Sequence, residues 1–329
     1  MCREDQQLST RAIRSGVSGR WATVGGCAGD DPGGSAMSGL AEYLRDWSPR
    51  PVERSDRVTS WAVDAFAALL DQPSPLAGGR AELPPLWHWF GFLDHPAQSE
   101  LGADGHPADG RFLPPIPHRR RMFAGGRWYQ RRPLPVERPV SCRSAVASVE
   151  VKTGRSGEMA FVTVRNEFVV DGADGEPSVT EEQDIVYRSQ PDPPPGAAPA
   201  SRAPAAPAGT EQQQPPEHEL ELTPDPALLF RFSALTYNGH RIHYDQPYVT
   251  GVEGYPGLVV HGPLLALLAL ELPRRHRPDR RVTEFRYRLR RPAFAGQTLR
   301  ARSVGDELEV GVPGAPASLT ASVRLTEEG

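Results

Sequence analysis

The stretch that decides the fold runs from residue 254 to residue 270 and reads Gly-Tyr-Pro-Gly-Leu-Val-Val-His-Gly-Pro-Leu-Leu-Ala-Leu-Leu-Ala-Leu. Pro263 suits the first position of a helix, where its missing N–H leaves no hydrogen bond unmade. The residues after it are apolar on every side, and a helix without a polar face has to be covered all round. The stretch therefore predicts a buried helix that begins near Pro263 and is wrapped by a sheet.

Strands that could wrap this helix are predicted close to it in the sequence. Segments in which apolar and polar residues alternate follow the helix, at Val282–Leu289, Gln297–Ser303 and Ala317–Leu325. We expect a further short strand before the helix, at Phe230–Ala234.

The first half of the chain repeats this order. A helix is predicted from Val58, with Thr59 or Ser60 as its cap. A long covering loop should follow from Pro84 to Gly126, with a short helical piece at Trp87–Leu93. Three antiparallel strands are then expected, at Ser141–Lys152, Met159–Val170 and Glu181–Arg188. The predicted fold class is α+β, a double hotdog in which each half is a curved antiparallel sheet wrapped around an apolar helix.

Two stretches of low complexity set the expected domain boundaries. Residues 1–37 are small and polar without a periodic apolar pattern, so we expect a disordered arm, and Met37 could be the initiator. Residues 189–219 are rich in Pro and Ala, which is typical of an extended linker. The two hotdog domains should therefore span residues 38–188 and 220–329, with the catalytic site in the second.

Composition excludes several classes of protein. No apolar run approaches the ~20 residues that a membrane helix needs, and no secretory signal is recognisable, so we expect a cytoplasmic protein. The net charge of −4 gives no basic surface for nucleic acid. The three cysteines, Cys2, Cys27 and Cys142, lack metal-ligand spacing, and a disulfide framework is not expected.

The densest group of proton-handling residues lies in the stretch Ser233–Asp245, which contains Asn238, His240, His243 and Asp245. His243 is the best candidate for a general acid or base, because an imidazole titrates near neutral pH. Two other interpretations stay open. These residues could be surface or capping groups, or His240, His243, His261 and Asp245 could bind a metal, although no HExxH pattern is present.

Two further features point to the binding of an anion. Gly262 stands at the predicted start of the apolar helix, where a free backbone N–H can stabilise an oxyanion. Arg119, Arg120 and Arg121 follow one another in the first half, and Arg127 is nearby. Guanidinium groups suit a coenzyme A phosphate or a second carboxylate, although a solvated run of charge has the same appearance.

These stretches resemble the MaoC-like dehydratases and type-2 enoyl-CoA hydratases, and in particular the subgroup with an added N-terminal dehydratase-like domain. Hydroxyacyl-thioester dehydratases of type 2 and 3-methylfumaryl-CoA (mesaconyl-C4-CoA) hydratases belong to that subgroup. The resemblance rests on Tyr237–Asp245, His261-Gly262 and Arg119–Gly126 and covers nearly the whole chain.

The resemblance implies an acyl thioester bound at the seam of the two halves and a hydration site in the second half. The family places an Asp five residues before its catalytic His, and here these positions hold Asn238 and His243. Since an Asn cannot act as a base, His243 would transfer the proton and Asn238 would orient the water. The family glycine that holds the thioester oxygen corresponds to Gly262.

The expected function is that of a hydro-lyase, which hydrates an enoyl thioester or dehydrates a 3-hydroxyacyl thioester. It needs no metal or redox cofactor, its partner is an acyl-CoA or acyl-carrier-protein substrate, and the chain should form a homodimer. Further candidates for substrate contacts are His261, His240, Asp245 and the three arginines at 119–121. A hotdog thioesterase and a non-catalytic acyl-thioester-binding subunit are the alternatives.

Overall fold

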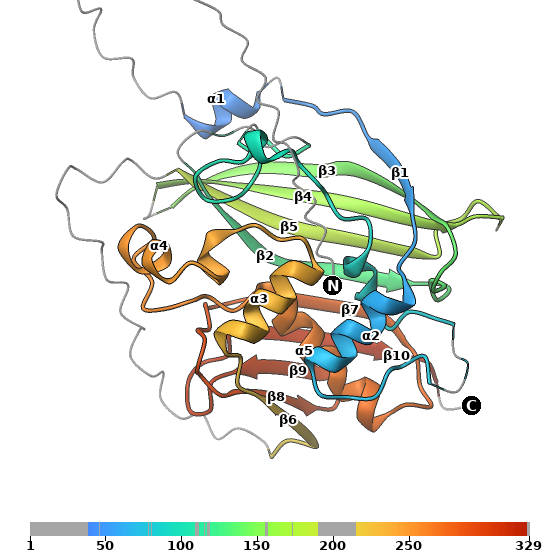
Figure 1. Ribbon diagram of the computed structural model, residues 1–329. Coiled ribbons are helices and arrows are strands. Elements are labelled where there is room, and N and C mark those ends of the chain that lie inside the picture. The colour runs from blue at the N-terminus through green and yellow to red at the C-terminus, as the bar shows by residue number, and fades with distance from the viewer. Residues whose placement is uncertain are drawn as a thin grey trace, which may run out of the picture. The chain divides into compact units, whose positions relative to one another are not determined.

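The apolar helix of the second half, α5 (Gly262–His276), begins where the sequence predicts it, with Pro263 in its first turn. The computed structural model describes residues 39–327, except 46, 78, 80, 109–111, 115, 117–118, 155–156, 173 and 190–214. The residues from Leu264 to Pro273 are all buried. In Figure 1, α5 lies against the strands of the second half, which confirms a helix wrapped by a sheet.

The described strands join in one antiparallel sheet of ten strands, in the order β1-β3-β4-β5-β2-β7-β10-β9-β8-β6. The strands of the first half are β1 (Val52–Asp56), β2 (Arg119–Gln130), β3 (Val140–Gly154), β4 (Gly157–Val170) and β5 (Val179–Ser189). Those of the second half are β6 (His218–Leu222), β7 (Val282–Leu289), β8 (Leu299–Val304), β9 (Glu307–Gly311) and β10 (Leu319–Leu325).

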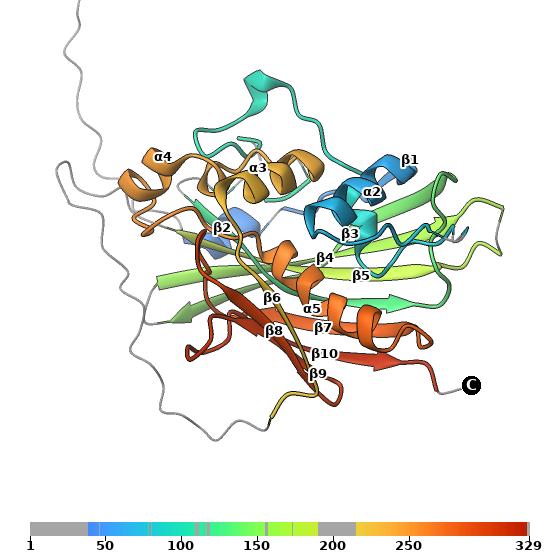
Figure 2. The ribbon, with the colours of Figure 1, turned by 60° about the horizontal axis from the view of Figure 1, so that its bottom comes forward.

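The remaining elements are short helices. They are α1 (Leu40–Leu44), α2 (Ser60–Leu69), η1 (Trp87–Phe90), η2 (Gln98–Glu100), α3 (Pro226–Leu235), η3 (Arg241–His243) and α4 (Gln246–Gly251). As predicted, Thr59 caps α2, because its hydroxyl accepts a hydrogen bond from the backbone N–H of Ala62. Figure 2 shows α2, α3 and α5 on the same face of the sheet.

The two halves meet where β2 pairs with β7, from Gly125 opposite Arg288 to Tyr129 opposite Glu284. Gly125 has a positive φ of 147°, and a Cβ placed there would lie 2.3 Å from the carbonyl oxygen of Tyr287. Glycine is therefore required for the two strands to approach each other. One core of buried apolar residues extends through both halves, and a second, smaller cluster lies in the first half. The antiparallel sheet with helices packed on it confirms the α+β double hotdog.

Three expectations from the sequence were wrong. Phe230–Ala234 is part of the helix α3, because Asp225 caps it and Pro226 follows in its first turn. Arg119, Arg120 and Arg121 do not lie in a loop but begin strand β2. The strands β1, β2, β6 and β9 were not expected, and β6 begins inside the stretch taken as linker.

Other expectations fall on residues that the structure does not describe. The N-terminal arm, most of the linker, Cys2 and Cys27 lie outside the described residues, and Cys142 is buried as a free thiol. The described residues belong to one compact unit, and the boundaries between the two hotdog domains stay a prediction. Among the described residues, the helices lack the combination of length and hydropathy that a membrane span requires.

Candidate active site

His243 lies at the end of η3, in the loop between α3 and α4, and is 7% exposed. Its Nδ1 lies 2.7 Å from the carbonyl oxygen of Val259. A carbonyl only accepts hydrogen bonds, so Nδ1 carries the hydrogen and Nε2 keeps the lone pair of the neutral ring. Burial lowers the pKa of His243 to about 4, against the opposing effect of the Val259 carbonyl. At neutral pH the ring is therefore a base that is ready to accept a proton at Nε2.

His261 supports this ring from the start of α5. The two imidazoles are stacked, with centroids 3.6 Å apart and an interplanar angle of 17°. Nε2 of His261 lies 2.8 Å from the hydroxyl of Ser233, and the residue has no exposed surface. Burial lowers the pKa of His261 well below its usual value. His261 is therefore a neutral ring that holds His243 in place and offers no surface to a substrate.

Gly262 follows His261 directly and is the first residue of α5. The first N–H groups of a helix have no acceptor within the helix, and the positive end of the helix dipole lies there. A Cβ at this position would lie 2.4 Å from Cδ1 of Leu289 and 3.4 Å from Cδ1 of Phe123. The absence of a side chain thus keeps the backbone close to β2 and β7, beside the stacked histidines.

Asn238 starts the loop that carries His243. Its backbone N–H donates to the carbonyl of Ser233 over 2.8 Å, and its side-chain Oδ1 accepts from the backbone N–H of His240 over 3.0 Å. Because the oxygen is engaged with the loop itself, the amide NH₂ is the part of the side chain that remains to orient a water.

Asp245, another candidate from the sequence, has a structural position. Its carboxylate caps α4 by accepting from the backbone N–H of Tyr248, and it pairs with the guanidinium of Arg241 at 2.8 Å. The hydrogen bonds and the charge of Arg241 lower the pKa of this carboxyl. Both oxygens therefore hold the loop together.

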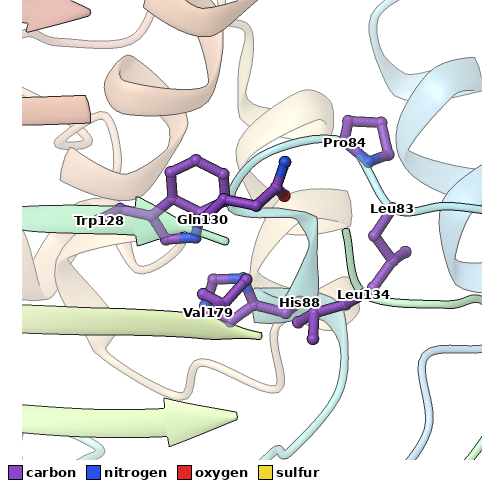
Figure 3. Close-up of a pocket in the computed structure, with 7 residues that line it drawn as sticks. All are labelled: Leu83, Pro84, His88, Trp128, Gln130, Leu134 and Val179. Atoms are coloured by element: carbon purple, nitrogen blue, oxygen red, sulfur yellow. The ribbon is translucent and has the colours of Figure 1, made fainter. Parts of the chain in front are cut away.

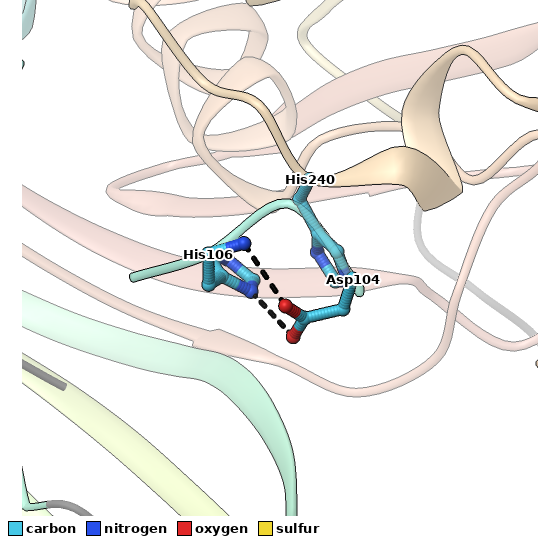
Figure 4. Close-up of side chains that lie close together, drawn as sticks. All are labelled: Asp104, His106 and His240. Atoms are coloured by element: carbon cyan, nitrogen blue, oxygen red, sulfur yellow. Dashed lines mark hydrogen bonds and ion pairs between the residues drawn. The ribbon is translucent and has the colours of Figure 1, made fainter. Parts of the chain in front are cut away.

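The structure brings His240 beside two residues that sequence reasoning missed, Asp104 and His106 of the first half (Figure 4). The rings of His106 and His240 have centroids 4.1 Å apart, and the His240 ring meets His243 edge-on at 5.5 Å. An aspartate followed two residues later by a histidine is too common a pattern to predict a functional site from the sequence. Asp104 and His106 lie beside His240 only because the fold brings two distant segments of the chain together.

The alternative interpretation of a metal site named His240, His243, His261 and Asp245, and the structure does not bring these four together as one group of ligands. The described residues contain one group with three metal-ligating atoms within 4.8 Å of one another, and it consists of Asp104, His106 and His240. In that group both oxygens of Asp104 accept hydrogen bonds from His106, one from the backbone N–H and one from Nδ1. We therefore interpret the group as a carboxylate–imidazole pair rather than as a set of metal ligands.

The arginines have separate environments. Arg121 is half-buried, and its charge is among the influences that lower the pKa of His240, after burial and the charges of His106 and His243. Arg127 is engaged with Glu182 and Asp184 on β5, which makes it unsuitable as a phosphate contact. The side chains of Arg119 and Arg120 lie outside the described residues.

A second polar group lies within the core of the first half. Glu181 and His88 are both buried and form an ion pair at 2.9 Å. Figure 3 shows His88 at a hollow that it lines with Trp128, Gln130 and other residues, and this hollow has no room for a water molecule. The pair therefore stabilises the fold and is not a binding site.

The pH dependence of activity should report the low pKa of His243. We expect kcat/KM to stay level from pH 8 down to pH 6 and to fall only as the pH approaches about 4, where the ring becomes protonated. An unperturbed histidine would cause the fall near pH 6.5. The measurement is a pH profile of kcat/KM, with circular dichroism at each pH to confirm that the protein is folded. A midpoint near pH 6.5 would contradict a buried base.

Comparisons with known proteins show which family the chain resembles. The sequence profile of the family "Hydroxyacyl-thioester dehydratase type 2" matches residues 86–295. Mesaconyl-C(4)-CoA hydratase from Chloroflexus aurantiacus is 44% identical over 291 residues, which cover 85% of this chain and 96% of the relative. The mitochondrial hydroxyacyl-thioester dehydratase type 2 of Schizosaccharomyces pombe is 44% identical over 87 residues, or 26% of this chain and 29% of the relative.

Solved structures share the fold at low sequence identity. A MaoC-like dehydratase from Phytophthora capsici superimposes with a TM-score of 0.58 at 14% identity, covering 86% of this chain and 97% of that one. HtdX of Mycobacterium tuberculosis gives a TM-score of 0.55 at 18% identity, covering 84% and 99%. The profile match and the near full-length relative show that the chain is a hydro-lyase that belongs to the hydroxyacyl-thioester dehydratase type 2 family.

Proposed function

We propose that the chain adds water to the double bond of an enoyl thioester, or removes it from the 3-hydroxyacyl product, with His243 as the base. The observation that carries this proposal is the buried, neutral imidazole of His243, whose Nδ1 is fixed by Val259 and whose ring is stacked beside the N-terminus of α5. A base next to a donor for an oxyanion is what the hydration of a thioester needs.

In the proposed reaction, Nε2 of His243 takes a proton from water as the water oxygen bonds to C3. The electron pair of the double bond moves toward the thioester carbonyl, and the enolate oxygen receives a hydrogen bond from the N–H of Gly262. Protonation of C2 then completes the addition. Asn238 orients the water, and neither a metal nor a redox cofactor takes part in these steps.

The substrate class is suggested by the relative from C. aurantiacus, which is named for mesaconyl-C(4)-CoA. We propose a short, branched enoyl-CoA with a free carboxylate, and Arg121 as the contact for that carboxylate. Hydrogen bonds to charged groups contribute about 1.5–3 kcal/mol. Mesaconyl-C4-CoA should therefore exceed crotonyl-CoA in kcat/KM by about 10-fold or more. Equal kcat/KM values for the two substrates would refute the carboxylate contact without contradicting the hydro-lyase activity.

Asn238 provides a test of the water-orienting role. Asn238→Ala should lower turnover, because a misplaced water loses the advantage of orientation. Asn238→Asp restores the Asp-and-His pair of the wider family, so this variant should remain active. The turnover of both variants is measured by monitoring hydration of the enoyl thioester through its loss of ultraviolet absorbance. A melting curve shows whether each variant is folded. Full activity in folded Asn238→Ala would exclude Asn238 from the site.

The location and assembly of the protein stay predictions. We expect a cytoplasmic homodimer, with coenzyme A or an acyl-carrier protein as the carrier of the acyl group. Sedimentation of the purified protein and assays with both carriers would decide these points.

A further inference from the structure

The loop 102–108 of the first half is docked on the loop of the second half that carries His243. The backbone N–H of Arg241 donates to the carbonyl of Asp104 over 2.9 Å, and the Arg241 guanidinium donates to the carbonyl of Ala103 over 2.9 Å. Gly105 has a φ of +88°, and a Cβ there would lie 1.9 Å from the carbonyl oxygen of Gly239. The two backbones are therefore in direct contact, and the contact depends on glycine at position 105.

This docking places a carboxylate–imidazole pair beside the site. One oxygen of Asp104 lies 3.0 Å from Nδ1 of His106, and the other accepts from the backbone N–H of His106 over 2.9 Å. A carboxylate holds Nδ1 in its protonated form, so the acid or base chemistry of this ring is left to Nε2. The His106 side chain is 13% exposed and lies against His240, whose ring in turn meets His243.

The surroundings of Asp104 and His243 differ. Burial would raise the pKa of Asp104, but the hydrogen bonds and charge of His106 outweigh it, and the pKa of the carboxyl is lowered. Burial and the charge of His106 lower the pKa of His243. An imidazole held by an ionised carboxylate and a buried neutral imidazole suit the roles of acid and base in one reaction.

We propose that His106, held by Asp104, is the second proton-handling residue of the active site and supplies the proton that C2 receives. This inference rests on the proposed hydration. His243 takes one proton from water as oxygen bonds to C3, and Nε2 of His106 gives one proton to C2. The proton on His243 then returns to His106 through solvent, so that each cycle adds one water and consumes no net proton. The first half thereby contributes chemistry that Asn238, which has no carboxylate, cannot contribute.

The test compares Asp104→Asn and His106→Gln with His95→Ala, an exposed histidine of the same segment whose ring nitrogen lies near the carbonyl of Leu93. Asp104→Asn and His106→Gln should lower kcat by about 10²-fold or more, with KM within about twofold of wild type and an unchanged melting temperature. His95→Ala should behave as wild type.

A second measurement tests whether His106 carries a positive charge beside His243. In His106→Gln the acidic limb of the kcat/KM profile should move to higher pH, because a positive charge that lowers the pKa of His243 has been removed. The titratable and charged groups around these rings include Asp104 and His106 of the loop, His240, Arg241 and His243, Tyr248 of α4, His261 before α5 and Arg121 of β2. A neutral His106 would leave this limb in place.

Three results would overturn the proposal. Each applies only if the wild-type enzyme hydrates its substrate. The first is a kcat within about twofold of wild type in both Asp104→Asn and His106→Gln, and the second is a loss of kcat in His106→Gln without a shift of the acidic limb of its kcat/KM profile. The third is wild-type activity that requires one bound divalent metal. The last result would make Asp104, His106 and His240 a metal site. If the wild-type enzyme hydrates no enoyl thioester, the proposed function itself has failed.

Discussion

Replacing His243 with alanine is expected to lower turnover by about 10²- to 10⁴-fold, the usual contribution of general acid–base catalysis, while the protein stays folded. The reason is that Nδ1 is held by the carbonyl of Val259, so Nε2 is the nitrogen able to take a proton from water. His243→Gln should show a similar loss, because an amide cannot accept that proton. The assay monitors hydration of the unsaturated thioester through the decrease in its ultraviolet absorbance. A melting curve shows that each variant is folded.

His276→Ala is the matched control for this experiment. His276 lies in the last turn of α5, is exposed, and stacks on His218 at 4.1 Å. Turnover of this variant should equal that of wild type. If folded His243→Ala kept near-normal turnover, the base would have to be another residue, with His240 the next candidate.

Replacing Glu181 with alanine should lower the free energy of unfolding by about 3–5 kcal/mol, because it leaves the buried His88 without its partner. Glu181 also accepts hydrogen bonds from Trp89 and Gln183. Burial alone would raise the pKa of Glu181, but the charge of His88 and these hydrogen bonds outweigh it, and the pKa is lowered. Glu181 therefore stabilises the fold at pH values above the pKa that its carboxyl has in the unfolded chain. This stabilisation is lost as the pH falls through the lower pKa that the carboxyl has in the folded protein.

Urea unfolding at neutral pH, with Glu182→Ala as control, measures this effect. Glu182 is the next residue of β5, is half-buried and pairs with Arg127, so its loss should cost no more than about 1 kcal/mol. Equal stabilities for the two variants would contradict the role of the buried pair.

The helix at the centre of the second half could be predicted because its signal is local. Pro263 and the apolar residues that follow it determine both where α5 begins and that it is buried. The stretch Phe230–Ala234 shows the opposite case. A short apolar run does not distinguish a strand from a helix by itself. Asp225 and Pro226 were the deciding signals, because they cap and begin α3.

The site could be predicted only in part, for the same physical reason. Asn238, His243 and Gly262 could be proposed from the sequence because they lie in two short stretches with family motifs. Asp104 and His106 reach His240 only through the docking of two distant loops, which no periodicity or spacing reveals. In the sequence, Asn238 stands where the wider family has an Asp, and this departure gave no indication of which distant residues lie beside the site.

The most direct test of the hydro-lyase assignment is product analysis after incubation of the wild-type protein with mesaconyl-C4-CoA and crotonyl-CoA in ¹⁸O-labelled water. We expect the product to be a hydroxyacyl thioester heavier by one labelled water, no free coenzyme A to form, and His243→Ala to form this product about 10²- to 10⁴-fold more slowly. Release of free coenzyme A with label in the acyl carboxylate would show a thioesterase and contradict the account.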